Sequence, residues 1–201
     1  MNSAYKNTCF LWLMLSLLCT LTGCLSKRRG PAPILSNANY NKGDHNGIPT
    51  DVLGSSGFFN RSGNLMQDYA DLMEVNVHEL KNERLYQFIN NWMGTPYAYG
   101  GTSKHGIDCS GFAGLVMDEV YGKSLPRSSE EQATVIKRKY ERQLKEGDLV
   151  FFSFGSSKIN HVGIYLHNGR FVHASTTKGI IISNLKDTWY YKAFKRAGTV
   201  K

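Results

Sequence analysis

Apolar and polar positions divide the chain into a helical part followed by a strand-forming part. A helical pattern begins near Leu65, and a second helix is expected from an Asn76 cap, with Glu79 in its first turn, to a stop at Gly94. The apolar face of this second helix recurs at helical spacing, at Leu85, Ile89, Trp92 and Met93. The first part of the folded region is therefore expected to be helical.

A third helix is predicted over residues 109–121, with a stop at Gly122. Its core-facing positions follow the same helical spacing, at Phe112, Leu115, Val116 and Val120. Farther along, Ser128 and Glu131 match a capping box, which predicts a shorter helix that reaches about Lys139.

Beyond Gly147 the pattern changes to the alternation that is typical of strands. Strands are predicted over residues 149–154, 161–167, 170–175 and 179–184. Asn168-Gly169 is the strongest turn signal between two of them. Helices followed by neighbouring strands predict an α+β domain, with the helices packed on an antiparallel β-sheet.

The first 24 residues have the layout of a signal peptide, in which Lys6 precedes an apolar run over residues 10–18. This run is shorter than the roughly 20 residues that span a bilayer, which argues against a retained membrane helix. Gly23 followed by Cys24 resembles the lipobox of bacterial lipoproteins, where the cysteine carries the lipid. We therefore expect a lipoprotein signal peptide over residues 1–24 and lipidation of Cys24, in preference to plain secretion.

A flexible linker is expected over residues 25–63, before a folded domain over residues 64–201. Half of the residues from 26 to 63 are Gly, Pro, Asn or Ser, and they show little hydrophobic periodicity. The formal net charge of +8 fits nucleic acid, anionic lipid or an acidic polymer as a partner. Export argues against nucleic acid, and a solvated surface accounts for the charge equally well.

Cys109 is the one cysteine that the expected processing leaves unpaired. Cys9 and Cys19 lie in the removable segment, and Cys24 is consumed by lipid. An unpaired thiol in an exported protein calls for a chemical role, although free cysteine also serves as a small buried apolar residue. Because Cys109 lies in the first turn of its helix, free backbone N–H groups and the helix dipole favour its thiolate. Asp108 is placed to cap that helix.

Two histidines lie within strand patterns, where the backbone fixes an imidazole more firmly than a loop does. His161 and His173 follow Cys109 on neighbouring predicted strands. Together they predict a Cys-His-His arrangement, in which His161 exchanges the proton and His173 orients His161. The remaining histidines are assigned no role: His45, His78, His105 and His167.

The geometry of the hairpin at Asn168-Gly169 decides whether these two imidazoles can meet. A plain two-residue turn would point His161 and His173 to opposite faces of the sheet. A three-residue loop with a left-handed Gly169 and a bulge moves His173 opposite Gly163, which returns both imidazoles to one face. The sequence therefore predicts the bulged register.

Three segments, in this order, resemble the motifs of the NlpC/P60 cysteine peptidases. They are Asp108-Cys109-Ser110-Gly111-Phe112, His161-Val162-Gly163-Ile164-Tyr165 and Phe171-Val172-His173-Ala174-Ser175. The resemblance extends from about Leu85 to the C-terminus and includes residues 94–101, 125–127 and 147–152. Within the family, the chain is most similar to the small lipoprotein members that act as murein endopeptidases.

The resemblance implies a papain-like fold and a catalytic domain with leading helices. It implies cleavage of peptide bonds in peptidoglycan stem peptides or crosslinks, next to diaminopimelate, with no metal or cofactor. Cys109, His161 and His173 are the implied triad, and the reaction passes through a thioester.

Three further residues receive roles from the same resemblance. Tyr97 matches a tyrosine that assists the oxyanion or the cysteine, with aromatic packing as the alternative. Asp108 and Ser110 match positions that bind the free amine of the substrate in some members of the family.

Three other functions compete with this interpretation. A CHAP-like amidase, which cuts the muramoyl-alanine bond, also places its cysteine before its histidine. A wall-binding lipoprotein that has lost turnover would keep the same pocket. A zinc site formed by Cys109, His161 and His173 has acceptable ligand types and one open position. The motif sequences disfavour the amidase, and the presence of all three residues disfavours a protein without turnover. The lack of a close pair of ligands disfavours zinc.

We expect a monomer that acts on peptidoglycan and is tethered by its N-terminal lipid to the outer face of a bacterial membrane. Leu25 stands where an aspartate commonly retains lipoproteins in the inner membrane, which favours the outer membrane facing the periplasm. The bond that is cut, a D,D-crosslink or a γ-D-glutamyl bond, is left open.

Overall fold

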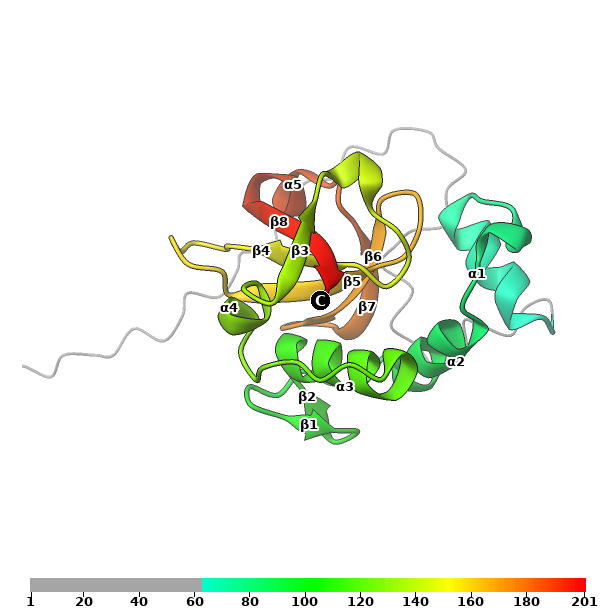
Figure 1. Ribbon diagram of the computed structural model, residues 1–201. Helices are drawn as coiled ribbons and strands as arrows, with labels where there is room; N and C mark the ends of the chain where they lie inside the picture. Colours follow the sequence, from blue (N-terminus) through cyan, green and yellow to red (C-terminus); the bar gives the residue numbers. More distant parts are fainter. Residues whose placement is uncertain (1–62) are drawn as a thin grey trace, which may run out of the picture. The chain divides into compact units, whose positions relative to one another are not determined.

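The computed structural model describes residues 63–201, which form helices and one large antiparallel sheet (Figure 1). The helices are α1 (Leu65–Met73), η2 (Val77–Glu79), α2 (Glu83–Trp92), α3 (Cys109–Tyr121), α4 (Ser129–Gln132), η3 (Glu141–Gln143) and α5 (Thr188–Ala193). The strands are β1 (Thr102–Ser103), β2 (Gly106–Ile107), β3 (Ile136–Lys139), β4 (Leu149–Phe152), β5 (His161–Tyr165), β6 (Arg170–Ser175), β7 (Gly179–Asn184) and β8 (Phe194–Val200). The expected α+β class is confirmed.

The large sheet has the strand order β3-β8-β4-β5-β6-β7, and every pair in it is antiparallel. Helix α3 packs against β5 and β6, which are neighbours in this order (Figure 1). Phe112 and Val116 of α3 are fully buried in the same core as Val162 and Val172 of the sheet. Burial of each such side chain contributes on the order of 2 kcal/mol, so this contact fixes the start of α3 against β5.

Helix α3 begins and ends where the sequence predicts. The Asp108 side chain accepts a hydrogen bond from the Gly111 N–H at 2.7 Å and so caps the first turn. Gly122 follows the last residue with a φ of 64°, a left-handed conformation that costs glycine little. The nucleophile candidate Cys109 is the first residue of this helix.

The expected helix from Asn76 is wrong in its extent. The Asn76 and Glu79 capping box closes only the short turn η2, and the backbone is extended at Leu80. A second cap follows at once, because the Asn82 side chain accepts from the Leu85 N–H and starts α2. Competition between two asparagine caps therefore divides the predicted helix.

The helix predicted from Ser128 to Lys139 is also wrong in its extent. The capping box forms as predicted, but α4 ends at Gln132. Residues Ile136–Lys139 form the edge strand β3, which pairs with β8. Strand pairing with a distant segment overrides local helical preference here. That segment, residues 194–200, was not predicted to be a strand.

The hairpin between β5 and β6 has the predicted bulged register. Ile164 pairs with Val172, so continuing the register places Gly163 opposite His173. The Leu166 N–H donates to the Arg170 carbonyl at 2.9 Å, and the Arg170 N–H donates to the His167 carbonyl at 2.8 Å. One extra residue therefore lies on the β5 side of the turn. Gly169 is left-handed, with a φ of 77°.

The turn of this hairpin is attached to the leading helices. Asn168 Nδ2 donates to the carbonyl of Met73, the last residue of α1, at 3.1 Å. The partly buried Glu146 carboxylate accepts from the Tyr86 hydroxyl of α2 at 2.6 Å and lies 3.3 Å from His167 Nε2. The segment that fixes the positions of His161 and His173 is thus held by residues outside the sheet.

The expected signal peptide over residues 1–24, the lipidated Cys24 and nearly all of the expected linker over 25–63 lie outside the described residues. Within residues 63–201, no helix has the length and apolar character needed to cross a membrane.

Replacing Gly163 with alanine tests the close approach of β5 and β6. A Cβ at this position would lie 2.6 Å from Phe171 Cδ2 and 3.0 Å from the Val172 carbonyl oxygen, so the strands must shift. We expect Gly163→Ala to lower the free energy of unfolding by about 2 kcal/mol in urea denaturation. Gly114→Ala is the control, because a Cβ there meets nothing within 4 Å. Equal stabilities of the two variants would contradict the tight register.

Candidate active site

Cys109 lies at the junction of α3 and the start of β5. Its side chain is buried, with an exposed fraction of 7%. The backbone N–H groups of Val162, Ser110 and Cys109 itself lie near enough to its sulfur to lower the pKa of the thiol. Since Val162 directly follows His161 in the chain, these contacts bring the thiol next to the residue that carries the candidate base.

The pKa of the Cys109 thiol is raised rather than lowered. Burial is the main cause, and the charge of Asp108 adds to it, while the three N–H donors offset part of the rise. The expectation that the helix terminus favours the thiolate is therefore opposed by burial. The thiol rests in its neutral form at neutral pH, and a base must remove its proton.

His161 and His173 form a hydrogen-bonded pair of imidazoles. His161 Nε2 lies 2.9 Å from His173 Nδ1, with exposed fractions of 8% and 2% for the two residues. This contact places both rings on one face of the sheet, as the bulged register requires. It also leaves His161 Nδ1 as the ring nitrogen available to exchange a proton with a thiol.

Aromatic rings surround the histidine pair and exclude water from it. Phe152 and Phe154 lie 5.9 and 5.6 Å from His161 between ring centroids. Burial lowers the pKa of His161 to about 4. Burial, together with the charge of His161, also holds the pKa of His173 well below its usual value. Both imidazoles are consequently neutral at neutral pH.

Two hydroxyl groups hold the outer nitrogen of His173, and the sequence analysis found neither. His173 Nε2 lies 3.0 Å from Ser183 Oγ and 3.2 Å from the Tyr190 hydroxyl. Ser183 pairs with Phe171 two positions from His173, which brings its side chain to the same face. The available signal for Ser183 was its position as a polar residue directly after the apolar run Ile180-Ile181-Ile182. Tyr190 lies on α5, which no hydrophobic pattern predicted.

Tyr97 lies near the nucleophile, as its expected role requires. Its segment pairs with Ile107, and the Ile107 N–H donates to the Pro96 carbonyl at 3.0 Å. Burial raises the pKa of Tyr97, and the charges of Cys109 and Asp108 raise it further, so the phenol lies within their electrostatic range. The ring is partly buried, so packing is also part of its role.

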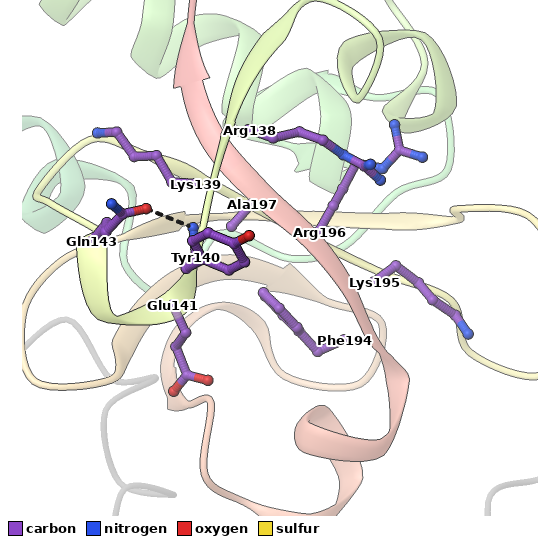
Figure 2. Close-up of a pocket in the computed structure, with 9 residues that line it drawn as sticks. All are labelled: Arg138, Lys139, Tyr140, Glu141, Gln143, Phe194, Lys195, Arg196 and Ala197. Atoms are coloured by element: carbon purple, nitrogen blue, oxygen red, sulfur yellow. Dashed lines mark hydrogen bonds between the residues drawn. The ribbon is translucent and has the colours of Figure 1, made fainter.

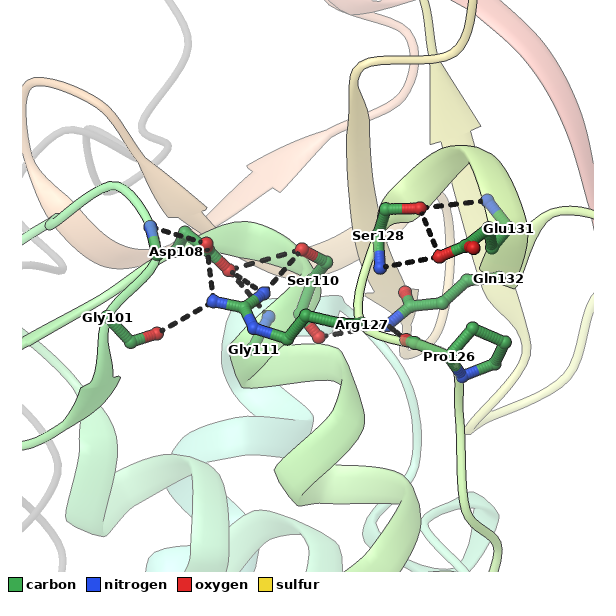
Figure 3. A network of polar contacts seen from close by, with 10 residues as sticks. Gly101, Asp108, Ser110, Gly111, Pro126, Arg127, Ser128, Glu131 and Gln132 are labelled. Atoms are coloured by element: carbon green, nitrogen blue, oxygen red, sulfur yellow. Dashed lines mark hydrogen bonds and ion pairs between the residues drawn. The ribbon is translucent and has the colours of Figure 1, made fainter.

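Asp108 is the centre of a polar network at the start of α3 (Figure 3). Arg127 binds it with two nitrogens, Nη1 to Oδ1 at 2.9 Å and Nη2 to Oδ2 at 2.8 Å. The Gly100 and Gly111 N–H groups donate to the same carboxylate at 2.8 and 2.7 Å. Although burial opposes them, these donors hold the pKa of Asp108 below its usual value.

Ser110 and Gln132 extend this network to α4. Arg127 Nη1 donates to Ser110 Oγ at 3.0 Å, and Gln132 Nε2 donates to the Ser110 carbonyl at 2.9 Å (Figure 3). In this arrangement both oxygens of Asp108 already accept hydrogen bonds from the protein. The amine-binding role of Asp108 and Ser110 stays a prediction, and Arg127 is a site residue that the sequence analysis placed only within a matching segment.

The zinc alternative does not fit the hydrogen bonding of the histidines. His173 directs Nδ1 to His161 and Nε2 to Ser183 and Tyr190, so neither nitrogen is turned toward Cys109. Among residues 63–201, no group of three or more His, Cys, Asp or Glu side chains is arranged to hold a metal ion. His161, His173 and the hydroxyls of Ser183 and Tyr190 are arranged as a chain of hydrogen-bonded groups.

Removing the two hydroxyls beside His173 tests the outer end of this chain. When His161 becomes an imidazolium, its Nε2–H donates to His173 Nδ1, so the His173 proton must lie on Nε2 and needs an acceptor. An unmet buried N–H costs about 1–3 kcal/mol. We expect Ser183→Ala with Tyr190→Phe to lower kcat/KM at least about tenfold and to shift the acidic limb of its pH profile to lower pH.

The exposed Tyr191 provides the matched control for this variant, since it follows Tyr190 and is 68% exposed. Tyr191→Phe should leave both the rate and the pH profile unchanged. A double variant with a wild-type pH profile would show that the hydroxyls only support packing.

The buried histidine pair also predicts how stability depends on pH. His161 titrates near 4 when folded and near its ordinary value of 6.5 when unfolded, so between these values only the unfolded state binds the proton. The free energy of unfolding should therefore fall as the pH is lowered from 6.5 toward 4, by up to about 1.4 kcal/mol per pH unit for this residue. Urea denaturation at several pH values should show a shallower slope for His161→Asn, whereas exposed His105→Asn should keep the wild-type slope. Equal slopes for all three proteins would contradict the burial of a neutral His161.

Comparisons with known proteins agree with this geometry. The chain is 41% identical over 138 residues to a probable endopeptidase NlpC homolog from Haemophilus influenzae, covering 69% of this chain and 66% of the relative. It is 41% identical over 134 residues to murein DD-endopeptidase MepS/murein LD-carboxypeptidase from Escherichia coli, covering 67% and 70%. A crystal structure of an NlpC/P60 family protein from Bacillus cereus matches with a TM-score of 0.56 and 28% identity, covering 60% of this chain and 40% of that one.

The family assignment rests on the folded region that carries the site. The profile described as the NlpC/P60 family matches residues 94–199, a range that contains Cys109, His161 and His173. The chain belongs to the NlpC/P60 family.

Proposed function

We propose that this protein is a cell-wall hydrolase that cuts peptide bonds in peptidoglycan stem peptides or crosslinks, with Cys109 as nucleophile. The observation that carries the proposal is the hydrogen-bonded pair of His161 and His173, together with a buried thiol at the start of α3 that lies near the Val162 N–H. The relatives named as endopeptidases and as a murein DD-endopeptidase support the choice of substrate.

The proposed reaction starts from neutral partners. The Cys109 proton moves to His161 Nδ1 as sulfur attacks the carbonyl carbon and forms a tetrahedral intermediate. The C–N bond then breaks, and the leaving amine takes the proton from His161, which leaves a thioester. A water molecule gives its proton to His161 and attacks the thioester, and the proton returns to sulfur as the acid product leaves.

His173 acts as a positioning residue in this scheme. It accepts the His161 Nε2–H at 2.9 Å and so keeps the ring turned toward the thiol. A neutral imidazole adds no full negative charge, so the protonated His161 depends on hydrogen bonds that run to Ser183 and Tyr190. The Cys109 backbone N–H and the Tyr97 hydroxyl are the proposed donors to the oxyanion.

The two alternatives that keep the same fold differ in their products. A muramoyl-alanine amidase would release whole stem peptides from the glycan, whereas an endopeptidase leaves a shortened stem or divides a crosslink. A wall-binding protein without turnover would release neither. The intact set of Cys109, His161 and His173 favours an active enzyme, and the relatives' names favour the endopeptidase.

We also propose that lipid on Cys24 tethers the enzyme to the outer face of a bacterial membrane, with the outer membrane favoured by Leu25. Such a tether keeps the domain close to its polymeric substrate. Fractionation of cells that carry Cys24→Ala should move the protein from the membrane to the soluble fraction, and an unchanged membrane fraction would refute the tether.

Digestion of isolated peptidoglycan tests the proposed activity. We expect the wild-type protein to release shortened or uncrosslinked muropeptides, identified by mass spectrometry. Cys109→Ala should lose at least about a thousandfold in rate, because the residue that forms the covalent bond is gone. Treatment with a thiol-alkylating reagent should have the same effect.

The histidines provide a matched control for this experiment. His161→Asn should lose turnover to a similar extent, whereas His105→Asn, which changes an exposed histidine, should retain it. Release of muropeptides by Cys109→Ala at the wild-type rate would refute the mechanism, and release of whole stem peptides would establish the amidase.

A further inference from the structure

A hollow lies between the end of β3, the turn η3 and the start of β8. Its volume is about 470 Å³. Figure 2 shows Tyr140 and Phe194 on one side of β8, and the cationic side chains of Arg138, Lys195 and Arg196, which also line the hollow, on the other side. We call this hollow the β3–β8 groove.

The β3–β8 groove carries an excess of positive charge that the protein does not neutralise. Within the described part of the chain, the exposed side chains of Arg138 and Lys195 form no hydrogen bond or ion pair. Arg196 donates from Nη1 to the Ala133 carbonyl at 3.1 Å, but its Nε is buried without a partner. Glu141 is the one carboxylate in the lining.

Lys139, in the same strand, is a cation whose charge the protein neutralises. Its Nζ lies 2.8 Å from the buried Asp148 carboxylate, so it makes little contribution to the free charge of the groove. The contrast with Arg138 and Lys195 is informative, because unneutralised cations close together repel one another and favour an anionic ligand.

An exposed aromatic ring also lines the groove. Tyr140 is 70% exposed, and Arg142 covers its ring at 5.2 Å from the centroid. A neighbouring hollow of about 480 Å³ shares Tyr140 and Glu141 and adds Arg142 and Lys186 to the lining. The cationic surface therefore continues past η3 and is long enough to follow an extended ligand.

The groove is connected to the candidate active site by packed aromatic rings. Phe194 in its lining lies 6.0 Å from Phe152, and Phe152 lies 5.9 Å from His161, between ring centroids. The same three residues are aligned across β8, β4 and β5. Two strand spacings amount to about 10 Å, so one polymeric ligand can occupy the groove and the active site together.

We propose that the β3–β8 groove binds carboxylate groups of a peptidoglycan strand and holds the polymer beside the active site. Arg138 and Lys195 bind the carboxylates, and Tyr140 contacts an apolar part of the strand. The proposal rests on the proposed function, because that function supplies the polymer. It adds an anchoring site that takes no part in the bond cleavage.

A peptide or glycan strand fits this surface better than an anionic membrane does. The cations line a hollow with an aromatic ring inside it, whereas a flat bilayer surface engages cations that project outward. The phosphate groups of lipids share the negative charge of carboxylates, so the experiment must separate the two sources.

Binding of the full chain to isolated peptidoglycan sacculi tests the proposal. All proteins carry Cys109→Ala, so that the polymer is not digested during the measurement. We expect Arg138→Ala with Lys195→Ala to weaken co-sedimentation with sacculi about tenfold, since two charge-assisted contacts are lost. The matched control is Arg84→Ala with Lys201→Ala, which removes the same charge from exposed positions outside the groove and should bind as before.

Two further arms identify the ligand. In the first, the carboxyl groups of the sacculi are amidated with carbodiimide. The protein with the unchanged groove should bind these sacculi as weakly as the groove variant binds untreated sacculi. Vesicles of phosphatidylglycerol should bind the groove variant and its control equally.

Equal loss in the groove variant and the control would show that only net charge matters, and would overturn the proposal. Selective loss of vesicle binding in the groove variant, with sacculus binding unchanged, would assign the groove to a membrane instead. Unaltered thermal unfolding of each variant excludes a folding defect. If the wild-type enzyme releases no muropeptides while the groove variant still loses sacculus binding, the proposed function fails and the groove is supported.

Discussion

The hydrogen bond between His161 and His173 is the constraint on which the rest of the structure depends. Its 2.9 Å length requires two imidazoles on adjacent strands to share one face of the sheet. That requirement fixes the β5–β6 register, and the register needs the extra residue before Asn168 and the missing side chain at Gly163. A change of register anywhere in this hairpin would separate the two rings, even with both histidines in place.

The pair also explains why the site is closed to water. Two neutral imidazoles can be buried at modest cost provided that every ring nitrogen has a partner, and the hydroxyls of Ser183 and Tyr190 supply the outer one. The same burial raises the pKa of the Cys109 thiol. In the proposed mechanism, the nucleophile and the base are therefore both uncharged at rest, and charge appears only when the proton moves during attack.

Much of the site could be predicted from the sequence because its parts have strong local signals. The start of α3 at Cys109 follows from Asp108 and the apolar spacing behind it, and the bulged hairpin follows from the parity of the two histidines. Ser183 has only the weak signal of a polar residue after an apolar run, and Tyr190 has none, because their role depends on how β7 and α5 meet β6. The strands β3 and β8 were missed for a similar reason, since each is stabilised by the other across more than 50 residues of chain.

The attachment of the hairpin turn to the leading helices has a consequence for where the functional unit begins. The family match starts at residue 94, yet the Met73 carbonyl of α1 and the Tyr86 hydroxyl of α2 hold the turn that aligns the histidines. A chain trimmed to the family boundary would contain every residue of the site and lack the supports that keep the rings in line. We therefore expect the smallest autonomous unit to be larger than the range that the family profile matches and to extend back to α1.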